Sequence, residues 1–205
     1  MFLNMKKLIL LILFISVLVQ VHAQSYFQEI QEFQSELNAE YANPETSPLE
    51  AQDMESFEGL PYFEADSIYR VVASLDFNVD KSYMKVPTYA GKIKIYQRYA
   101  AATFMLNGQK HTLYLYQSEQ LKEIEEYKDY LFLPFKDKTN GEESYGGGRY
   151  LDLKIPEGNT IIIDFNKAYN PYCAYSDRYN CPVPPAENKL SVAIKAGVKA
   201  PVYKH

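Results

Sequence analysis

The dipeptide Asn107-Gly108 is the feature that most constrains the fold, because it stands between two strand-like segments, Thr103 to Leu106 and Lys110 to Tyr116. Both positions of a two-residue hairpin turn need positive φ angles, which Asn and Gly adopt readily. Further strand signals lie at Ser67 to Leu75, Lys92 to Tyr99 and Tyr130 to Phe135. Many short strands without alternating helices favour a mainly β fold, an antiparallel β-sandwich or barrel with an N-terminal helix, with α+β as the alternative.

A second hairpin is expected near the C-terminal side of the chain. The segment Tyr150 to Lys154 would turn through residues 156–159 and return along Thr160 to Phe165. In this register Leu151 pairs with Asp164, and Asp152 lies on the opposite face from Asp164.

The first 23 residues predict a secretory signal peptide. Lys6 and Lys7 precede the apolar run Leu8 to Val19, and Ala23 ends a stretch of the kind that signal peptidase cleaves. The run is shorter than the roughly 20 residues needed to span a bilayer, so we expect cleavage after Ala23 and no stable membrane anchor afterwards. The protein is therefore expected to be exported, to the periplasm or the medium.

Residues 24–44 are expected to form an N-terminal helix, with apolar residues at spacings of three and four from Phe27 to Leu37. It should end before Asn43-Pro44, which disfavours helix. Residues 45–205 are then expected to form a single β-rich domain.

Charge argues against nucleic acid as a partner. The chain has 21 Lys and Arg against 26 Asp and Glu, and because Lys6 and Lys7 belong to the leader, the rest carries a formal charge of -7. A protein that binds phosphate backbones carries the opposite balance.

The segment 135–188 differs from the rest of the chain, since loop-forming residues alternate with aromatic and acidic ones. It reads PFKDKTNGEESYGGGRYLDL, then IIIDFNKAYNPYCAY and NCPVPPAEN. These blocks, together with Ser47-Pro48-Leu49 and the run from Phe57 to Phe63, closely resemble the bacterial and archaeal family called domain of unknown function 1684. The resemblance covers nearly all of the chain after the leader, but it implies no established activity.

The most suggestive block is Gly146-Gly147-Gly148-Arg149. Consecutive glycines allow backbone N–H groups to converge on an anion, and an adjacent Arg can complete the clamp. The alternative is a glycine bulge with Arg149 buried against an acid. On the first interpretation a ligand site includes nearby polar and aromatic side chains, namely Tyr150, Asp164, Asn166, Tyr169, Asn170 and Tyr172.

The supply of catalytic residues is limited. Asp137, Asp152, Asp164 and Glu187 could serve a hydrolase as carboxylates, although capping of turns is the expected role of Asp152 and Asp164. After the leader only His111 and His205 remain, which disfavours Ser-His-Asp and Cys-His enzymes, and His111 is expected on an exposed strand face. No cofactor is expected.

Cys173 and Cys181 are separated by seven residues, which does not match the spacing of zinc ligands, so no metal site is expected. In an oxidising compartment the two are expected to form a disulfide. The resemblance keeps a second possibility open, a pair of thiols with another role, because similar cysteines occur in family members without leaders.

Three functions remain open. The leading expectation is an exported module that binds a small anionic or saccharide ligand. The alternatives are a hydrolase that uses paired carboxylates and no histidine, and a structural or interaction protein of the cell envelope.

Overall fold

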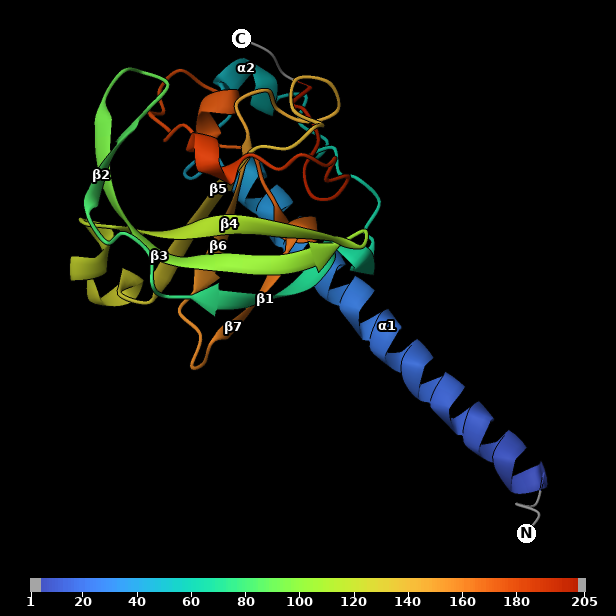
Figure 1. Cartoon of the computed structure of the whole chain (residues 1–205). Helices are drawn as coiled ribbons and strands as arrows, with labels where there is room; N and C mark the ends of the chain where they lie inside the picture. Colours follow the sequence, from blue (N-terminus) through green and yellow to red (C-terminus); the bar gives the residue numbers. More distant parts are fainter. Residues whose placement is uncertain (1–4, 203–205) are drawn as a thin grey trace.

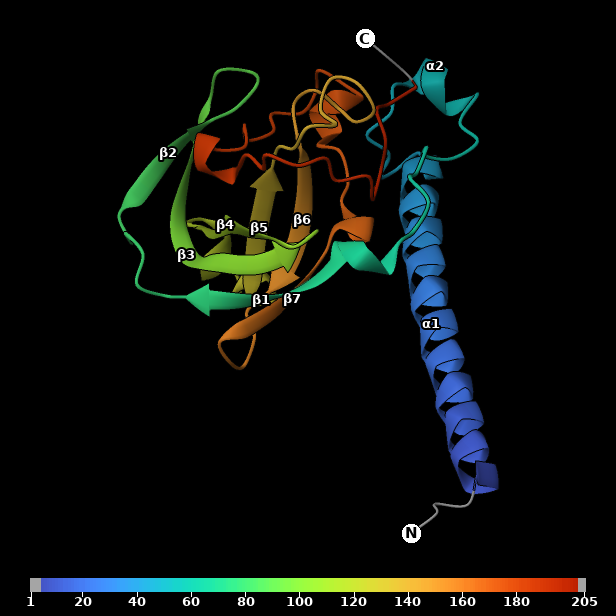
Figure 2. The same ribbon diagram turned by 45° about the vertical axis from the view of Figure 1, so that its right-hand side comes forward.

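A computed structural model describes the backbone of residues 5–202 and the side chains of residues 24–202. The chain is mainly β, with one curled antiparallel sheet that forms a half-barrel and one long N-terminal helix beside it (Figures 1 and 2). The sheet has seven strands in the order β6-β5-β4-β3-β1-β7, and β2 pairs with β3 off this path. The strands are β1 (Arg70–Asp76), β2 (Tyr83–Pro87), β3 (Ile93–Leu106), β4 (Gln109–Ser118), β5 (Tyr130–Phe135), β6 (Arg149–Lys154) and β7 (Thr160–Asp164).

Helix α1 (Met5–Ala42) is the one long helix among the described residues. It ends next to Asn43, and α2 (Ala51–Met54) is a single turn. The predicted leader, residues 1–23, lies outside the residues whose side chains are described. Among the described residues, no helix combines the length and the apolar composition that crossing a membrane requires. The short 3₁₀ helices within residues 5–202 are η1 (Ser67–Tyr69), η2 (Leu121–Glu123), η3 (Glu125–Tyr127), η4 (Phe165–Lys167), η5 (Tyr172–Ala174) and η6 (Ala186–Asn188).

The predicted Asn107-Gly108 hairpin is confirmed. Leu106 of β3 pairs with Gln109 of β4, and the two residues between them have φ angles of 51° and 74°. Positive φ at both positions is the geometry of a two-residue turn that follows the strand twist. The prediction for His111 was wrong, because this β4 side chain is buried against Phe104, with ring centroids 5.7 Å apart.

The second predicted hairpin is not formed as expected, although both of its strands are present. Strand β6 pairs with β5, where Leu151 lies opposite Leu133, and β7 pairs with β1, where Asp164 lies opposite Arg70. The two ends of the segment that joins β6 to β7 bind different neighbours and not each other. The Ile155 N–H donates to the Asp129 carbonyl, and the Asn159 carbonyl accepts from the Leu75 N–H. The half-barrel therefore stays open between β6 and β7.

The main core lies inside the curled sheet and follows the two-residue period of the strands. Leu131, Leu133 and Phe135 of β5 point into it, as does Leu151 of β6. The C-terminal segment packs onto the same core through Leu190, Ile194 and Ala196. A second cluster, which includes Tyr41, Leu49, Leu60 and Tyr175, attaches the end of α1 to the loops.

Candidate functional site

Strand β6 divides the predicted site residues between two environments. Successive side chains of a strand point to opposite faces. Arg149 and Leu151 therefore face the main core, whereas Tyr150 and Asp152 face a cavity on the other side of the sheet. Arg149 and Tyr150, adjacent in the sequence, do not serve one site.

Arg149 is enclosed by protein and does not line a cavity, which corrects the expectation that it binds a ligand. Its side chain and that of Asp137 are both 0% exposed, and Nη2 of Arg149 donates to Asp137 Oδ2 at 2.8 Å. The guanidinium also donates to the carbonyls of Ile194, at 2.8 Å, and Ala196. These contacts join β6 to the C-terminal segment, so Arg149 is a structural residue of the core. Burial against an acid was the alternative considered from the sequence, and the acid is Asp137.

The adjacent glycines allow close packing of the backbone. Gly148 has a φ of +100°, and a Cβ atom there would lie 2.7 Å from the Phe135 carbonyl oxygen. A Cβ on Gly147 would overlap the ring of Tyr145 and the hydroxyl of Tyr89. Gly146 borders a small cavity of about 330 Å³, which it shares with Cys173. The positive φ and the backbone contact at Gly148 give a structural reason for glycine at this position that does not involve anion binding.

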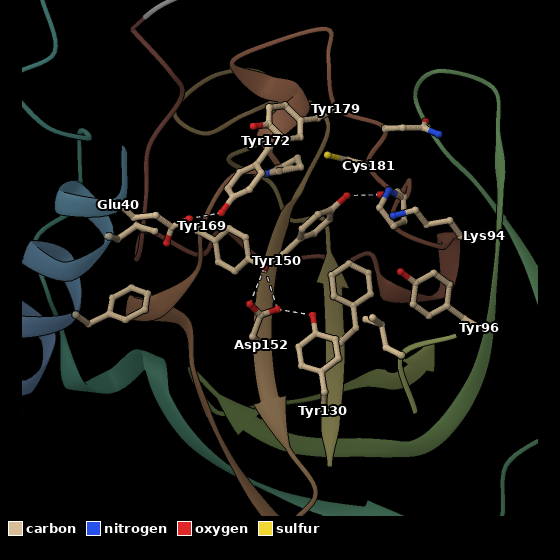
Figure 3. A pocket seen from close by; sticks show the side chains of 17 residues that line it. Glu40, Lys94, Tyr96, Tyr130, Tyr150, Asp152, Tyr169, Tyr172, Tyr179 and Cys181 are labelled. Carbon is tan, nitrogen blue, oxygen red and sulfur yellow. Dashed lines mark hydrogen bonds between the residues drawn. The ribbon is translucent and has the colours of Figure 1, made fainter. Parts of the chain in front are cut away.

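A larger cavity, of about 510 Å³, lies on the opposite face of β5 and β6 (Figure 3). We call it the tyrosine cavity, because six of its lining residues are tyrosines: Tyr96, Tyr130, Tyr150, Tyr169, Tyr172 and Tyr179. Helix α1 supplies Phe33, Leu37 and Glu40, and β3 supplies Lys94. The remaining lining residues are Leu121, Phe132, Asp152, Pro171, Asn180, Cys181 and Pro182.

Asp152 lies in this cavity between two phenol groups. Tyr130 donates to Oδ1 of Asp152 at 2.6 Å, and Tyr169 donates to Oδ1 and Oδ2 at 2.9 and 2.8 Å (Figure 3). Solvent reaches the carboxyl group through the cavity, but the surrounding aromatic walls limit its hydration. This desolvation raises the pKa of Asp152, the two tyrosine hydrogen bonds oppose the rise, and the charge of Glu40 adds to it.

The other polar groups of the cavity are fixed by neighbours from different elements. The Tyr172 hydroxyl donates to Glu40 on α1, and the Tyr150 hydroxyl donates to the Pro182 carbonyl. The ring of Tyr150 meets those of Phe132 and Tyr169 edge to face, with centroids 4.7 and 6.0 Å apart. The walls are thus held together by aromatic contacts and hydrogen bonds between protein side chains.

The remaining predicted residues lie outside the tyrosine cavity. Asp164 caps η4 by accepting from the Asn166 N–H at 3.1 Å, in line with the expected turn-capping role. Asn166 is buried and donates to Tyr26 and to the Asp66 carbonyl, at 2.8 Å each. Asn170 is buried and donates to the Tyr175 hydroxyl and the Lys199 carbonyl. All three hold loops in place.

The four carboxylates considered for catalysis differ in their partners. Asp137 pairs with Arg149, Asp164 pairs with Arg70 at 3.2 Å, and Glu187 forms a two-pronged pair with Arg98 at 2.8 Å. Within residues 24–202, Asp152 has no such cationic partner at salt-bridge distance. It is the candidate carboxylate that remains available to a ligand.

Three predicted residues, Tyr150, Tyr169 and Tyr172, line the tyrosine cavity, and so does Cys181. Sequence reasoning missed Tyr130, Tyr96, Lys94 and the α1 side chains. Strand periodicity could have indicated Tyr130, because it shares the face of Phe132 on β5. The sequence around Phe33, Leu37 and Glu40 does not indicate that these side chains line the cavity, since this depends on how α1 packs against the sheet.

The cysteines are thiols in this structure, and no disulfide joins them. The Cys173 N–H donates to Cys181 Sγ at 3.2 Å, so the two residues lie next to one another.

Comparison with known proteins places the chain in a family. A solved relative is the solution NMR structure of the uncharacterised protein from gene locus rrnAC0354 of Haloarcula marismortui, with 32% identity and a TM-score of 0.65. The similarity covers 87% of this chain and 96% of that one. A comparison with curated proteins finds no match. The family model described as protein of unknown function (DUF1684) matches residues 55–199, and the chain therefore belongs to this family.

Proposed function

We propose that the protein is an exported binding module that holds a small saccharide in the tyrosine cavity. The observation that carries the proposal is Asp152, a carboxylate with no cationic partner at salt-bridge distance among residues 24–202, held by two tyrosine hydroxyls inside a cavity walled by aromatic rings. A pocket that is largely aromatic with a few fixed polar groups is the usual form of a small-molecule site.

The chemistry of the walls favours a saccharide. Tyrosine rings offer flat apolar surface to the C–H faces of a sugar ring, and their hydroxyls offer hydrogen bonds at the rim. Asp152 can accept hydrogen bonds from sugar hydroxyls, and such bonds to a charged group are stronger than neutral ones. An anionic ligand is disfavoured, because Asp152 and Glu40 would repel it and Arg149 lies in the core.

Export and the disulfide belong to the same proposal. The leader-like residues 1–23 support export. The proximity of Cys173 and Cys181 supports a disulfide once the protein reaches an oxidising compartment. Thiol counting on unreduced protein tests the pairing, and two free thiols would contradict it.

Calorimetric titration of the full chain with cellobiose, maltose and diacetylchitobiose tests the ligand assignment. We expect one of these probes to bind, and Asp152→Asn to weaken its affinity by about tenfold or more, because a hydrogen bond to a charged group contributes about 1.5–3 kcal/mol. Glu157→Gln, at the exposed β6–β7 turn, is the matched control and should bind like the wild type. Absence of binding, or equal binding by Asp152→Asn, would contradict the proposal.

A second candidate function, glycoside hydrolysis, is favoured by one observation: Glu40 and Asp152 line the same cavity, and the charge of Glu40 helps to raise the pKa of Asp152. A raised pKa suits the general acid of a carboxylate pair. Chromatography of longer oligosaccharides after incubation with the protein would detect products. Hydrolysis that is abolished by both Glu40→Gln and Asp152→Asn would favour this candidate over simple binding.

A further inference from the structure

Cys181 combines two features that a merely structural thiol does not need. It is partly exposed, and it lines the tyrosine cavity, at the top of the view in Figure 3 between Glu40 and Lys94. Its neighbour Cys173 does not line the tyrosine cavity but borders the separate 330 Å³ cavity beside Gly146. A small molecule in the tyrosine cavity therefore meets Cys181 and not Cys173.

The groups around Cys181 favour its ionised form. The backbone N–H of Cys173, in the first turn after Pro171, donates to Cys181 Sγ at 3.2 Å. The Cys173 thiol, the backbone of Tyr172 and the charge of Lys94 act in the same direction, and together they lower the pKa of Cys181 against the opposing effect of burial. The hydrogen bond to Cys181, with burial, raises the pKa of Cys173. The pair is thus asymmetric: the sulfur that accepts the backbone N–H, and whose pKa is lowered, is the one that lines the tyrosine cavity.

We propose that Cys181 is a nucleophilic thiol that reacts with small disulfides entering the tyrosine cavity, and that Cys173 is the resolving thiol. The proposal does not depend on saccharide binding, since it rests on the position of the two sulfurs and their hydrogen bond.

The reaction proceeds in two steps. The Cys181 thiolate attacks one sulfur of a disulfide RSSR, a mixed disulfide forms at Cys181, and RS⁻ leaves and takes up a proton from solvent. Cys173 then loses its proton and attacks the Cys181 sulfur, which breaks the mixed disulfide and releases the second RS⁻. In total two protein thiols are oxidised to one disulfide while RSSR is reduced to two RSH.

The disulfide expected in the exported protein is thereby given a route of formation. The disulfide would also lie between the two cavities, because Cys181 lines the tyrosine cavity and Cys173 lines the smaller one with Tyr145 and Gly146. Reduction by an external dithiol would return the pair to the state seen here.

Mass spectrometry of the full chain, first reduced with a dithiol that is then removed and afterwards treated with hydroxyethyl disulfide, tests the proposal. In Cys173→Ser we expect a stable mixed disulfide at Cys181, since a serine hydroxyl can still donate to the sulfur but cannot resolve the adduct. In Cys181→Ser we expect Cys173 to react more slowly by about tenfold or more, because it lacks the stabilised thiolate. The wild type should release two thiols per chain and retain no adduct. Equal rates in the two variants, or a stable adduct on the wild type, would overturn the proposal.

The pH dependence separates reactivity from simple exposure. The rate of adduct formation in Cys173→Ser should reach its half-maximum below the value of about 8.5 that is typical of a free cysteine. A midpoint at or above that value would contradict a stabilised thiolate. Circular dichroism melting of each variant gives the fraction folded, so that a rate from an unfolded chain is not counted.

Discussion

The two faces of β6 show how one strand can carry two unrelated tasks. On one face the Arg149 guanidinium forms an ion pair with Asp137 and donates hydrogen bonds to three backbone carbonyls of the C-terminal segment, and no solvent reaches it. On the other face the Asp152 carboxylate accepts hydrogen bonds from Tyr130 and Tyr169 and has no cationic partner at salt-bridge distance within residues 24–202, and a cavity lies in front of it. The contrast indicates that a charged residue is a candidate for ligand binding only when its charge is not already paired with another charged side chain of the protein.

The energetic roles of the two residues differ accordingly. A buried pair contributes little net stability relative to apolar residues, but losing one partner leaves the other as an uncompensated charge. A desolvated carboxylate in a cavity has the opposite character, because it costs stability in the free protein, and under the proposed function it would gain its partner from a bound ligand.

The largest expected effect is that of Arg149→Ala, which should lower the free energy of unfolding by about 3–5 kcal/mol, since it leaves Asp137 buried and unpaired. The control is Lys128→Ala, which breaks the exposed pair with Glu125 and should cost only about 0–1 kcal/mol. Urea unfolding of the two variants measures both values. An Arg149→Ala protein as stable as the control would show that the charge is not held in the core.

Gly148→Ala should have the next largest effect. Its φ of +100° and the 2.7 Å approach of a Cβ to the Phe135 carbonyl give it two penalties, with strain alone expected to cost about 1–3 kcal/mol. Gly158→Ala is the matched control, because nothing lies within 4 Å of a Cβ at this exposed turn. Equal falls in the two melting temperatures would show that the backbone at Gly148 is not constrained by packing.

Asp152→Asn should have a smaller effect that depends on pH. Because the pKa of Asp152 is raised in the folded protein, its ionised form costs stability above that pKa, and the cost disappears when pH falls below the unfolded value. Asparagine does not titrate, so the stability of Asp152→Asn relative to wild type should increase from about pH 3 to pH 7.

The control for this slope is Asp80→Asn. A hydrogen bond from the Ser82 N–H lowers the pKa of Asp80, so the ionised form stabilises the fold and this contribution is lost as pH falls. The relative stability of Asp80→Asn should therefore decrease over the same rise in pH. Urea titrations at several pH values that give the same slope for both variants would contradict the difference in environment.

Local chemistry explains which parts of the fold could be predicted from the sequence. The turn at Asn107-Gly108 and the end of α1 before Pro44 depend on φ preferences of a few adjacent residues. The partners of β6 and β7 depend on hydrogen bonds to Asp129 and Leu75, which are distant in sequence from the turn that joins the two strands. In a curled sheet two consecutive strands can lie at opposite edges, as β6 and β7 do, and no pattern of neighbouring residues predicts that arrangement.

The site was predictable to a similar extent. The tyrosines 150, 169 and 172 were identified within the family signature, but the motif also contains Arg149, whose role depends on Asp137 and the C-terminal segment. The alternation along β6 separates Arg149 from Tyr150, and this information was already present in the strand assignment.

Amide chemical-shift mapping with isotope-labelled protein tests the central claim most directly, because it observes both regions in one titration. On addition of cellobiose, maltose or diacetylchitobiose, we expect shifts concentrated at Tyr130, Asp152 and Tyr169, with the signals of Gly146 to Gly148 unchanged. Shifts concentrated at Gly146 to Gly148, or none in either region with any of the three probes, would contradict the assignment of the tyrosine cavity as the ligand site.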